Sequence, residues 1–485
     1  MENNNIGNLA ASNVSPQAPA PLPVEPKKKM KWWKKILLII IVTLLVVIGL
    51  ALATPMVLSI LFPGDAVLVD NSNLLLKKVS VADENNGFFQ LASINDEDFY
   101  RPSKDEYQSP GAGSFSLDYT SDTKNLAWDQ TLVDNVLAKN QKVLQAFSEA
   151  ASKSAFQVPY YMDPANIHTN VQLYPMNGWR EMARLQAINA ISLLRIGKTD
   201  EALKEALKLN KVGHNIIVGH NPLIANLIGI AIQELGSKTI FKILAGGNIS
   251  KQVLVDAQKV LESNSDNIEG YKNAFRVGYI HLLNSINETT PEILSQSFKD
   301  ADSVEPTPEN KLYARLSKYK FYNKPNQTIN LYTDLSNLEV SAIGVRCEVK
   351  DLEEKYKSNE KDPQVRKIVL FTENAVGKYL FSYSGVVLGS AIGKGCENDL
   401  LVNVAQIELA LKQYKMENGL LPETLDALVP QYMESVPLDP FDHKPLCYSA
   451  EKGIIYSVGL KKQDLGGSEG EDWTKMENPT FHIKF

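Results

Sequence analysis

The most constraining feature of the sequence is an uncharged apolar run near the N-terminus, from Ile36 to Phe62. A helix rises about 1.5 Å per residue, so about 20 residues cross a bilayer core of about 30 Å. The run therefore predicts a transmembrane helix over residues 36–62. The stretch from Ala51 to Ala53 is typical of a signal-peptidase site, but the apolar run continues beyond it and is longer than a usual signal-peptide core. We therefore expect an uncleaved signal anchor rather than a cleaved signal peptide.

The residues before this run are rich in proline and then in lysine. Because residues 1–26 carry little apolar surface to offset the chain entropy, we expect residues 1–35 to form a disordered, basic cytoplasmic tail. Basic residues beside a spanning helix stay on the cytoplasmic side. The expected topology is a single-pass protein of the cytoplasmic (inner) membrane, N-terminus inside and residues 65–485 outside, in the periplasm. The flanking basic residues are Lys27, Lys28, Lys29, Lys31, Lys34 and Lys35.

The charge of the extracytoplasmic part excludes some partners. The formal net charge of the whole chain is −6. The first 62 residues carry six lysines and two acids, a net charge of +4, so the rest of the chain carries a net charge of −10. This net negative charge argues against a nucleic-acid-binding protein. It also argues against an extracytoplasmic part that is attracted to anionic lipid by its overall charge.

Helical periodicity dominates residues 65–395, which we expect to form a mainly helical extracytoplasmic domain. Two expected helices between Glu181 and Lys211, joined by a turn at Gly197, resemble a tetratricopeptide-type helical hairpin. No second copy follows at a period near 34 residues, so an ordinary αα-hairpin is the simpler interpretation. Thr199 or Asp200 is expected to cap its second helix. The expected helices cover 129–153, 181–197, 199–211, 223–244, 250–263, 267–286, 309–321, 331–358, 363–392 and 400–418.

The apolar stretch from Tyr379 to Ile392 is too short to span a membrane between Lys378 and Lys394. It is either a close-packed buried helix or a patch that faces the membrane.

Motifs for catalysis do not stand out, so no catalytic residue is predicted. The sequence contains no HExxH or GxxxxGK[ST] pattern. His214 and His220 are six residues apart, which places them on different faces of a helix. The three cysteines allow two interpretations: a bridge between Cys347 and Cys396 that leaves Cys447 free, or three buried thiols.

The last 90 residues contain several short elements in a fixed order. A helix over 400–418 ends at Gly419, a short helical turn follows Leu421-Pro422, and two β segments, 446–449 and 453–458, are expected to form a hairpin.

This order resembles the globular end of the major pseudopilin of type II secretion (general secretion pathway protein G), over roughly residues 400–472. The motifs that carry the resemblance are Ala410-Leu411-Lys412-Gln413-Tyr414-Lys415, Asn418-Gly419, Leu421-Pro422, Pro437-Leu438-Asp439-Pro440-Phe441 and Tyr456-Ser457-Val458-Gly459, followed by a Gly/Asp/Glu loop. The resemblance implies a small α+β pseudopilin-like module at 396–485. The chain lacks the Gly-Phe leader site and the early helix glutamate of pseudopilins, so assembly into a pseudopilus is not expected.

In the pseudopilins the final loop binds calcium, which takes six to eight oxygen ligands. Lys461 and Lys462 stand where the family has an early loop aspartate, so the alternative is a solvated acidic loop. The resemblance implies calcium as the only candidate cofactor, with Asp464, Glu469, Glu471 and Asp472 as its candidate ligands.

The remainder resembles uncharacterised, membrane-anchored bacterial proteins of planctomycete type. This second resemblance is carried by Ala82 to Gly87, the hairpin at 181–211, Gly229 to Ile232 and Asn323 to Asn326.

Two functions follow as hypotheses. The first is a non-enzymatic, membrane-anchored scaffold of the cell envelope, related to secretion, with a protein partner bound at its helical surfaces. The alternative is an anchored envelope hydrolase that uses acidic residues; a deep cleft with convergent acids and a raised carboxylate pKa would favour it.

Overall fold

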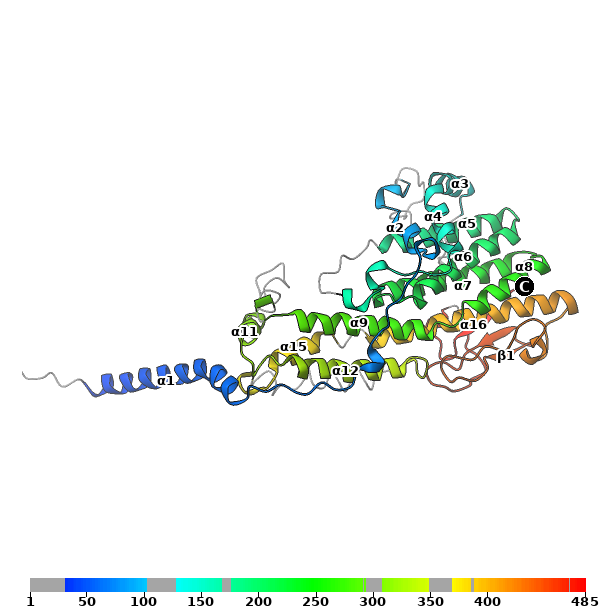
Figure 1. Ribbon diagram of the computed structural model, residues 1–485. Coiled ribbons are helices and arrows are strands. Elements are labelled where there is room, and N and C mark those ends of the chain that lie inside the picture. Colours follow the sequence, from blue (N-terminus) through cyan, green and yellow to red (C-terminus); the bar gives the residue numbers. More distant parts are fainter. Residues whose placement is uncertain are drawn as a thin grey trace, which may run out of the picture. The chain divides into compact units, whose positions relative to one another are not determined.

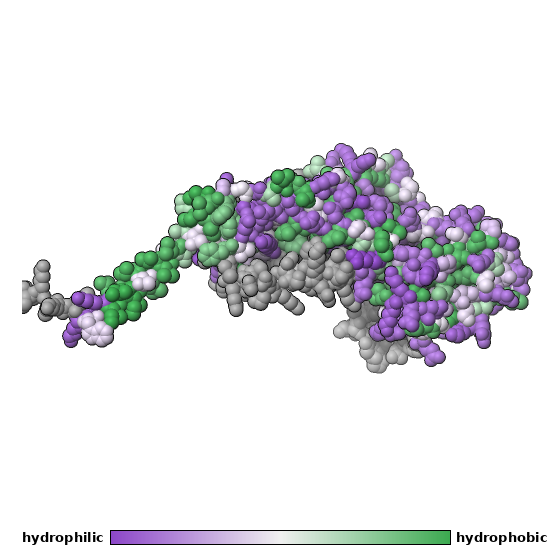
Figure 2. Space-filling view, turned by 90° about the horizontal axis from the view of Figure 1, so that it is seen from below, coloured by the Kyte–Doolittle hydropathy of each residue, from purple (hydrophilic) through white to green (hydrophobic). Residues whose placement is uncertain are grey.

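An apolar helix, α1, opens the described part of the chain in the computed structural model (Figure 1). The structure describes residues 31–102, 128–167, 176–290, 292–293, 308–348, 369–384, 388–470 and 472–485. Helix α1 runs from Trp32 to Leu61, and its side chains form an almost continuous apolar surface (Figure 2). It is long and apolar enough to cross a membrane, and its bounds agree with those of the predicted span to within a few residues.

Residues Leu58–Phe485 form one compact unit, and α1 up to Val57 belongs to the other. Residues 1–30 of the predicted basic tail lie outside the described residues. The larger unit is mainly helical. Its helices are α2 (Phe88–Ala92), α3 (Gln130–Lys139), α4 (Gln141–Ser152), α5 (Asn177–Arg195), α6 (Thr199–Val218), α7 (Leu223–Gly246), α8 (Lys251–Ser263), α9 (Ile268–Glu288), α11 (Pro308–Leu316), α12 (Pro325–Ala342), α15 (Ala375–Ser384) and α16 (Leu388–Asn418). Short 3-10 turns lie at Ser72–Leu74, Asp83–Asn85, Asp96–Asp98, Pro159–Tyr161, Pro164–Asn166, Val369–Phe371, Leu425–Leu428 and Trp473–Lys475.

The predicted hairpin is present as α5 and α6, and α6 packs against both α5 and α7. Gly197 takes a φ of +81°, as expected for the residue that ends α5. The predicted capping of α6 is wrong: Thr199 lies inside the helix, and Asp200 instead accepts a hydrogen bond from the backbone N–H of Ser250. Gly213 lets helices α6 and α7 cross closely, because a Cβ atom at this position would lie only 2.5 Å from the backbone nitrogen of Gln233.

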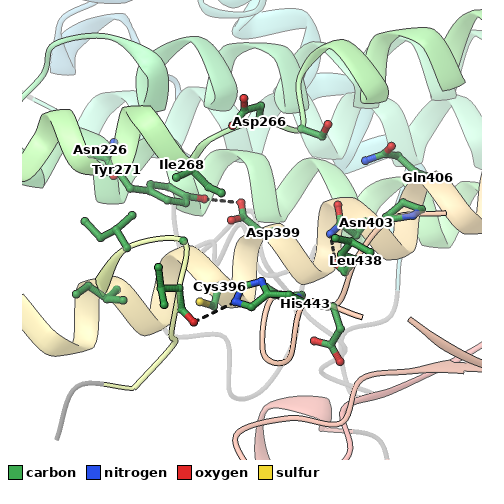
Figure 3. A pocket seen from close by; sticks show the side chains of 18 of the residues that line it. Asn226, Asp266, Ile268, Tyr271, Cys396, Asp399, Asn403, Gln406, Leu438 and His443 are labelled. Carbon is green, nitrogen blue, oxygen red and sulfur yellow. Dashed lines mark hydrogen bonds between the residues drawn. The ribbon is translucent and has the colours of Figure 1, made fainter. Parts of the chain in front are cut away.

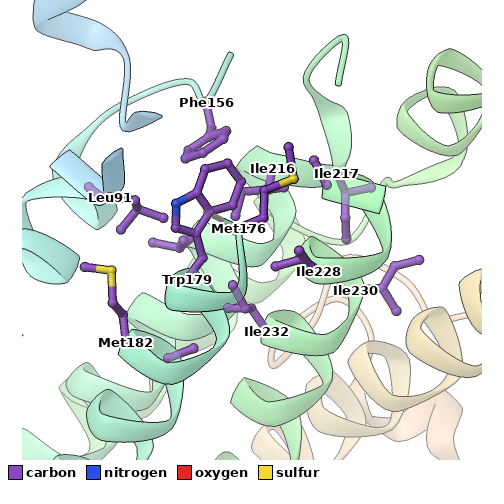
Figure 4. Packing of buried hydrophobic residues seen from close by; sticks show 14 of the residues in the cluster. Leu91, Phe156, Met176, Trp179, Met182, Ile216, Ile217, Ile228, Ile230 and Ile232 are labelled. Atoms are coloured by element: carbon purple, nitrogen blue, oxygen red, sulfur yellow. The ribbon is translucent and has the colours of Figure 1, made fainter. Parts of the chain in front are cut away.

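The largest cluster of buried apolar side chains lies around Trp179 of α5, which is 1% exposed (Figure 4). The Phe156 ring packs edge-on against the indole, with ring centroids 5.1 Å apart. Phe88 from α2 packs on the same indole at 6.2 Å. These aromatic contacts join α2 and the segment after α4 to α5.

The single helix expected over 129–153 is two helices, α3 and α4. The break is at Asn140, which is fully buried. Its side chain donates to the carbonyl of Tyr100 and accepts from the N–H of the same residue, both at 3.0 Å. A buried amide that satisfies a neighbouring backbone in this way competes with the helical ladder.

The chain that follows α1 is fixed along the start of α12. Asp65 accepts hydrogen bonds from the backbone N–H groups of Asn326 (2.8 Å) and Gln327 (3.1 Å), and so caps α12. Asn330 accepts from the N–H of Val69 at 3.0 Å and donates to the carbonyl of Val67 at 2.8 Å. We call residues 65–69 the strap.

Helix α16 spans 31 residues and packs against α7 and α8. The sequence predicted two helices here, 363–392 and 400–418, and this separation is wrong because α16 runs through residue 395. The proposed division at 395/396 therefore falls inside a helix. Residues 349–368 and 385–387 of the predicted helices lie outside the described residues. Phe381, Ala391 and Ile392 are buried, in agreement with the buried-helix interpretation of 379–392.

The C-terminal part forms a small antiparallel sheet of three strands in the order β1-β2-β3. The predicted hairpin is confirmed as β1 (Cys447–Ser449) and β2 (Ile454–Tyr456), with Tyr448 opposite Ile455. Strand β3 (Thr480–His482), with Phe481 opposite Ile455, was not predicted. The short turn after Leu421-Pro422 is present at Leu425–Leu428.

Of the two interpretations of the cysteines, the structure has the bridge. Cys347 and Cys396 form a disulfide with Cα atoms 5.8 Å apart, and Cys447 is free. The bridge ties the segment after α12 to α16.

Candidate functional site

A cavity of about 360 Å³ lies between the start of α9, the middle of α16 and the loop that precedes β1 (Figure 3). Residues Ile343 to Val345, next to the disulfide, complete the wall. These segments are far apart in the sequence, so the cavity exists only in the folded chain. A cavity of this size falls in the usual range of ligand pockets.

Asp399 of α16 lines this cavity beside Tyr271 of α9 (Figure 3). The Tyr271 hydroxyl donates to Asp399 Oδ1 at 2.8 Å, and the amide of Asn267 donates to the same oxygen at 3.0 Å. Asp399 Oδ2 accepts no hydrogen bond from the described residues. Burial raises the pKa of Asp399 to about 7, and nearby Asp266 adds to the rise, although the two hydrogen bonds act in the opposite direction.

Buried amides support Asp399 from behind. Asn398 donates to Gln233 Oε1 at 2.7 Å and to the Tyr271 hydroxyl at 3.0 Å. Asn267 donates to the same Gln233 oxygen at 3.0 Å, and its own oxygen lies 2.9 Å from His214 Nδ1. This network joins α6, α7, α9 and α16. Because each partner is held by another element, Asp399 is fixed in one position.

The opposite wall is built around Asp439, which is 1% exposed. Its Oδ1 accepts from the Phe441 N–H and the Ser457 hydroxyl, both at 3.0 Å. Its Oδ2 accepts from the Val458 N–H at 2.9 Å. Burial raises the pKa of Asp439, and these hydrogen bonds oppose the rise. Asp439 therefore holds the loop against the end of β2 and serves the shape of the wall.

The side near the disulfide is mainly apolar. Gly344 takes a φ of +78°, and a Cβ atom there would lie 2.9 Å from the Ile268 side chain. His443 crosses this side, with its Nε2 3.0 Å from the carbonyl of Val345. The loop and the segment after α12 are thus in direct contact.

The lining is acidic on one side and apolar on the other. Among the described residues that line the cavity there is no lysine and no arginine. Asp266 and Glu434 are exposed at the rim, and Glu262 accepts a hydrogen bond from the Glu434 N–H at 3.3 Å. The acidic members are Glu262, Asp266, Asp399, Glu434 and Asp439. Such a cavity favours a ligand that carries positive charge next to apolar surface.

The predicted calcium ligands lie elsewhere, in the loop before β3. Asp464 accepts from the Tyr456 hydroxyl at 3.1 Å and from the Gly466 N–H at 2.8 Å. Asp472 caps the turn at Trp473–Lys475 and pairs with Lys475 at 2.8 Å.

Glu469 is exposed, and Glu471 lies outside the described residues. In the part of the chain that the structure describes, no three His, Cys, Asp or Glu side chains come close enough to hold a metal ion. The calcium site stays a prediction.

Sequence reasoning missed Asp399, Tyr271 and the amides that support them. Each is an ordinary polar residue at a helical position, and only the crossing of α9 and α16 brings them together. The pseudopilin-like motif did contain Asp439, without revealing that it forms a cavity wall. No family model, curated protein or solved structure matches this chain.

Proposed function

We propose that this chain is a single-pass, membrane-anchored protein of the cell envelope that binds a partner protein in the cavity between α9, α16 and the 434–443 loop. The observation that carries the proposal is the cavity itself, with its acidic floor and apolar side. The pseudopilin resemblance of the loop and of β1–β2 makes a secretion-related partner our first expectation. The segment bound would present a lysine or arginine flanked by apolar side chains.

Two observations support an extracytoplasmic position for the cavity. The lysines before α1 predict that the N-terminus stays in the cytoplasm, so everything after the span lies outside. The disulfide Cys347–Cys396 lies next to the cavity, and such bridges persist in oxidising compartments.

Photo-crosslinking in the native membrane tests the proposal. A benzoylphenylalanine at Leu438, which lines the cavity and is 50% exposed, should capture a defined protein. The same probe at Leu465, which is 47% exposed and does not line the cavity, is the matched control. The double change Asp266→Lys and Glu434→Lys, at two exposed acids of the rim, should remove the adduct.

The control double change is Glu423→Lys and Glu451→Lys, at two exposed acids away from the cavity, and should leave the adduct in place. Identical adducts from both probe positions, or an adduct that survives the rim changes, would contradict the proposal.

A second candidate function, an envelope hydrolase, is favoured by one observation. A carboxyl group with a pKa of about 7, next to a second acid and open to a cavity, suits general acid catalysis near neutral pH. Hydrolysis of ester, peptide or glycoside substrates by the purified chain, lost in Asp399→Asn, would favour this function. Activity that is unchanged in Asp399→Asn would exclude it.

A further inference from the structure

Basic and aromatic residues alternate in α11 and in the turn that follows it. Residues 311–324 contain five basic side chains and no acid, although the chain after residue 62 carries −10. The basic residues are Lys311, Arg315, Lys318, Lys320 and Lys324, and the aromatic residues are Tyr313, Tyr319, Phe321 and Tyr322.

The two kinds of side chain face opposite ways. Tyr313, Phe321 and Tyr322 are no more than 6% exposed and belong to one buried cluster with residues of α15. Tyr313 stacks on Tyr379, with ring centroids 3.9 Å apart. Lys324 is also buried and pairs with Glu373. The other four basic residues are exposed, and we call them the basic patch: Lys311, Arg315, Lys318 and Lys320.

The basic patch lies where the chain leaves α1. The Leu58 side chain packs against the aromatic cluster, and the Phe62 ring lies 6.0 Å from that of Phe321. The Ser59 hydroxyl accepts a hydrogen bond from the Phe321 N–H at 3.2 Å. Because α1 ends at Leu61, these contacts place the cluster within one or two turns of the end of the apolar helix.

We propose that the basic patch contacts anionic phospholipid headgroups on the membrane surface from which the chain emerges. The inference rests on α1 being the membrane span, as the proposed function also requires. The positive charge of the patch favours anionic headgroups as its ligand. Its position beside the end of α1 favours a bilayer as their source. The acidic remainder of the body does not prevent this contact, because charges beyond about 8 Å are screened at physiological salt. Leu312 and Phe371, 37% and 65% exposed, are suited to the interfacial layer beside the headgroups.

Nanodiscs that hold the full-length chain provide the test. One set contains phosphatidylcholine alone, and the other contains phosphatidylcholine with phosphatidylglycerol. A benzoylphenylalanine at Leu312 should form a lipid adduct, read by mass spectrometry, and the yield should be several-fold higher in the discs with phosphatidylglycerol. High salt should remove the difference. Incorporation into both kinds of disc reports on the span separately, so a failure of the anchor is distinguished from a failure of the patch.

Charge reversal provides the second arm. The triple change Lys311→Glu, Arg315→Glu and Lys318→Glu should reduce the adduct in anionic discs to the level in neutral discs. The matched control reverses three exposed lysines of α6, α8 and the α5–α6 turn, and should not change the yield: Lys198→Glu, Lys204→Glu and Lys259→Glu.

Equal yields in the two lipids would overturn the proposal. So would a protein adduct in place of lipid when the probe at Leu312 is used in native membranes.

Discussion

Replacement of Asp399 by asparagine should make the protein more stable at alkaline pH. The folded chain raises the pKa of this carboxyl from 3.8 to about 7. Between these values the folded state keeps a proton that the unfolded state has lost, so the free energy of unfolding falls as the pH rises. At 1.36 kcal/mol per pKa unit, the full loss above pH 7 is about 4 kcal/mol. Asparagine cannot ionise and does not suffer this loss, while its oxygen still accepts from Tyr271 and Asn267.

The assay is denaturant unfolding of the full chain in detergent, followed by tryptophan fluorescence at pH 5 and pH 8. The stability gap between Asp399→Asn and the unaltered chain should widen by about 2.5 kcal/mol between these two conditions. Glu339 and Glu408, whose pKa values burial raises to about 8, affect both proteins equally and cancel. Asp426→Asn, at an exposed position that does not line the cavity, is the matched control. A gap that stays constant with pH, or a variant that is less stable at pH 8, would refute the reasoning.

Three further predictions concern packing and tethering. Asp439→Ala leaves three donors unpaired in the cavity wall and should lower the free energy of unfolding by about 3 kcal/mol, whereas Asp439→Asn should lower it less; urea unfolding of the two variants checks this. Cys347→Ser opens a loop of 49 residues and should lower stability by about 4 kcal/mol, a difference that must vanish when both proteins are unfolded in reductant. Trp179→Ala should lower stability by about 3–5 kcal/mol, and a loss below 1 kcal/mol in calorimetry would mean that the indole is not the centre of its cluster.

Features set by local sequence were predictable. The span follows from a run without charge, and the α5–α6 hairpin follows from apolar period and a glycine at the turn. The β1–β2 hairpin likewise lies between strong turn signals. In each case the determining residues are neighbours in the chain, so one sequence contains the information.

Features set by distant contacts were not predictable. The break at Asn140 depends on the backbone of Tyr100, forty residues earlier. The continuity of α16 depends on its packing against α7 and α8, because glycines in its first turns favour a break when only the local sequence is considered. The cavity depends on Asp399 meeting Tyr271, and no periodicity encodes that meeting. The candidate site therefore could not be predicted from the sequence, because it forms only where α9 and α16 cross.

The strap along α12 limits the flexibility of the connection between α1 and the rest of the chain. A flexible tether would allow the cavity to move relative to the end of α1. The root-mean-square end-to-end distance of such a tether is about 5–6 Å times the square root of its number of residues. Here Asp65 and Asn330 hold the residues that directly follow α1 along the start of α12, so this stretch does not act as a flexible tether. A partner held in the same membrane would then meet the cavity at a high effective concentration only when its own binding segment lies at the matching height. For the proposed partner, the strap would thus act as a geometric requirement that is separate from the side-chain contacts in the cavity.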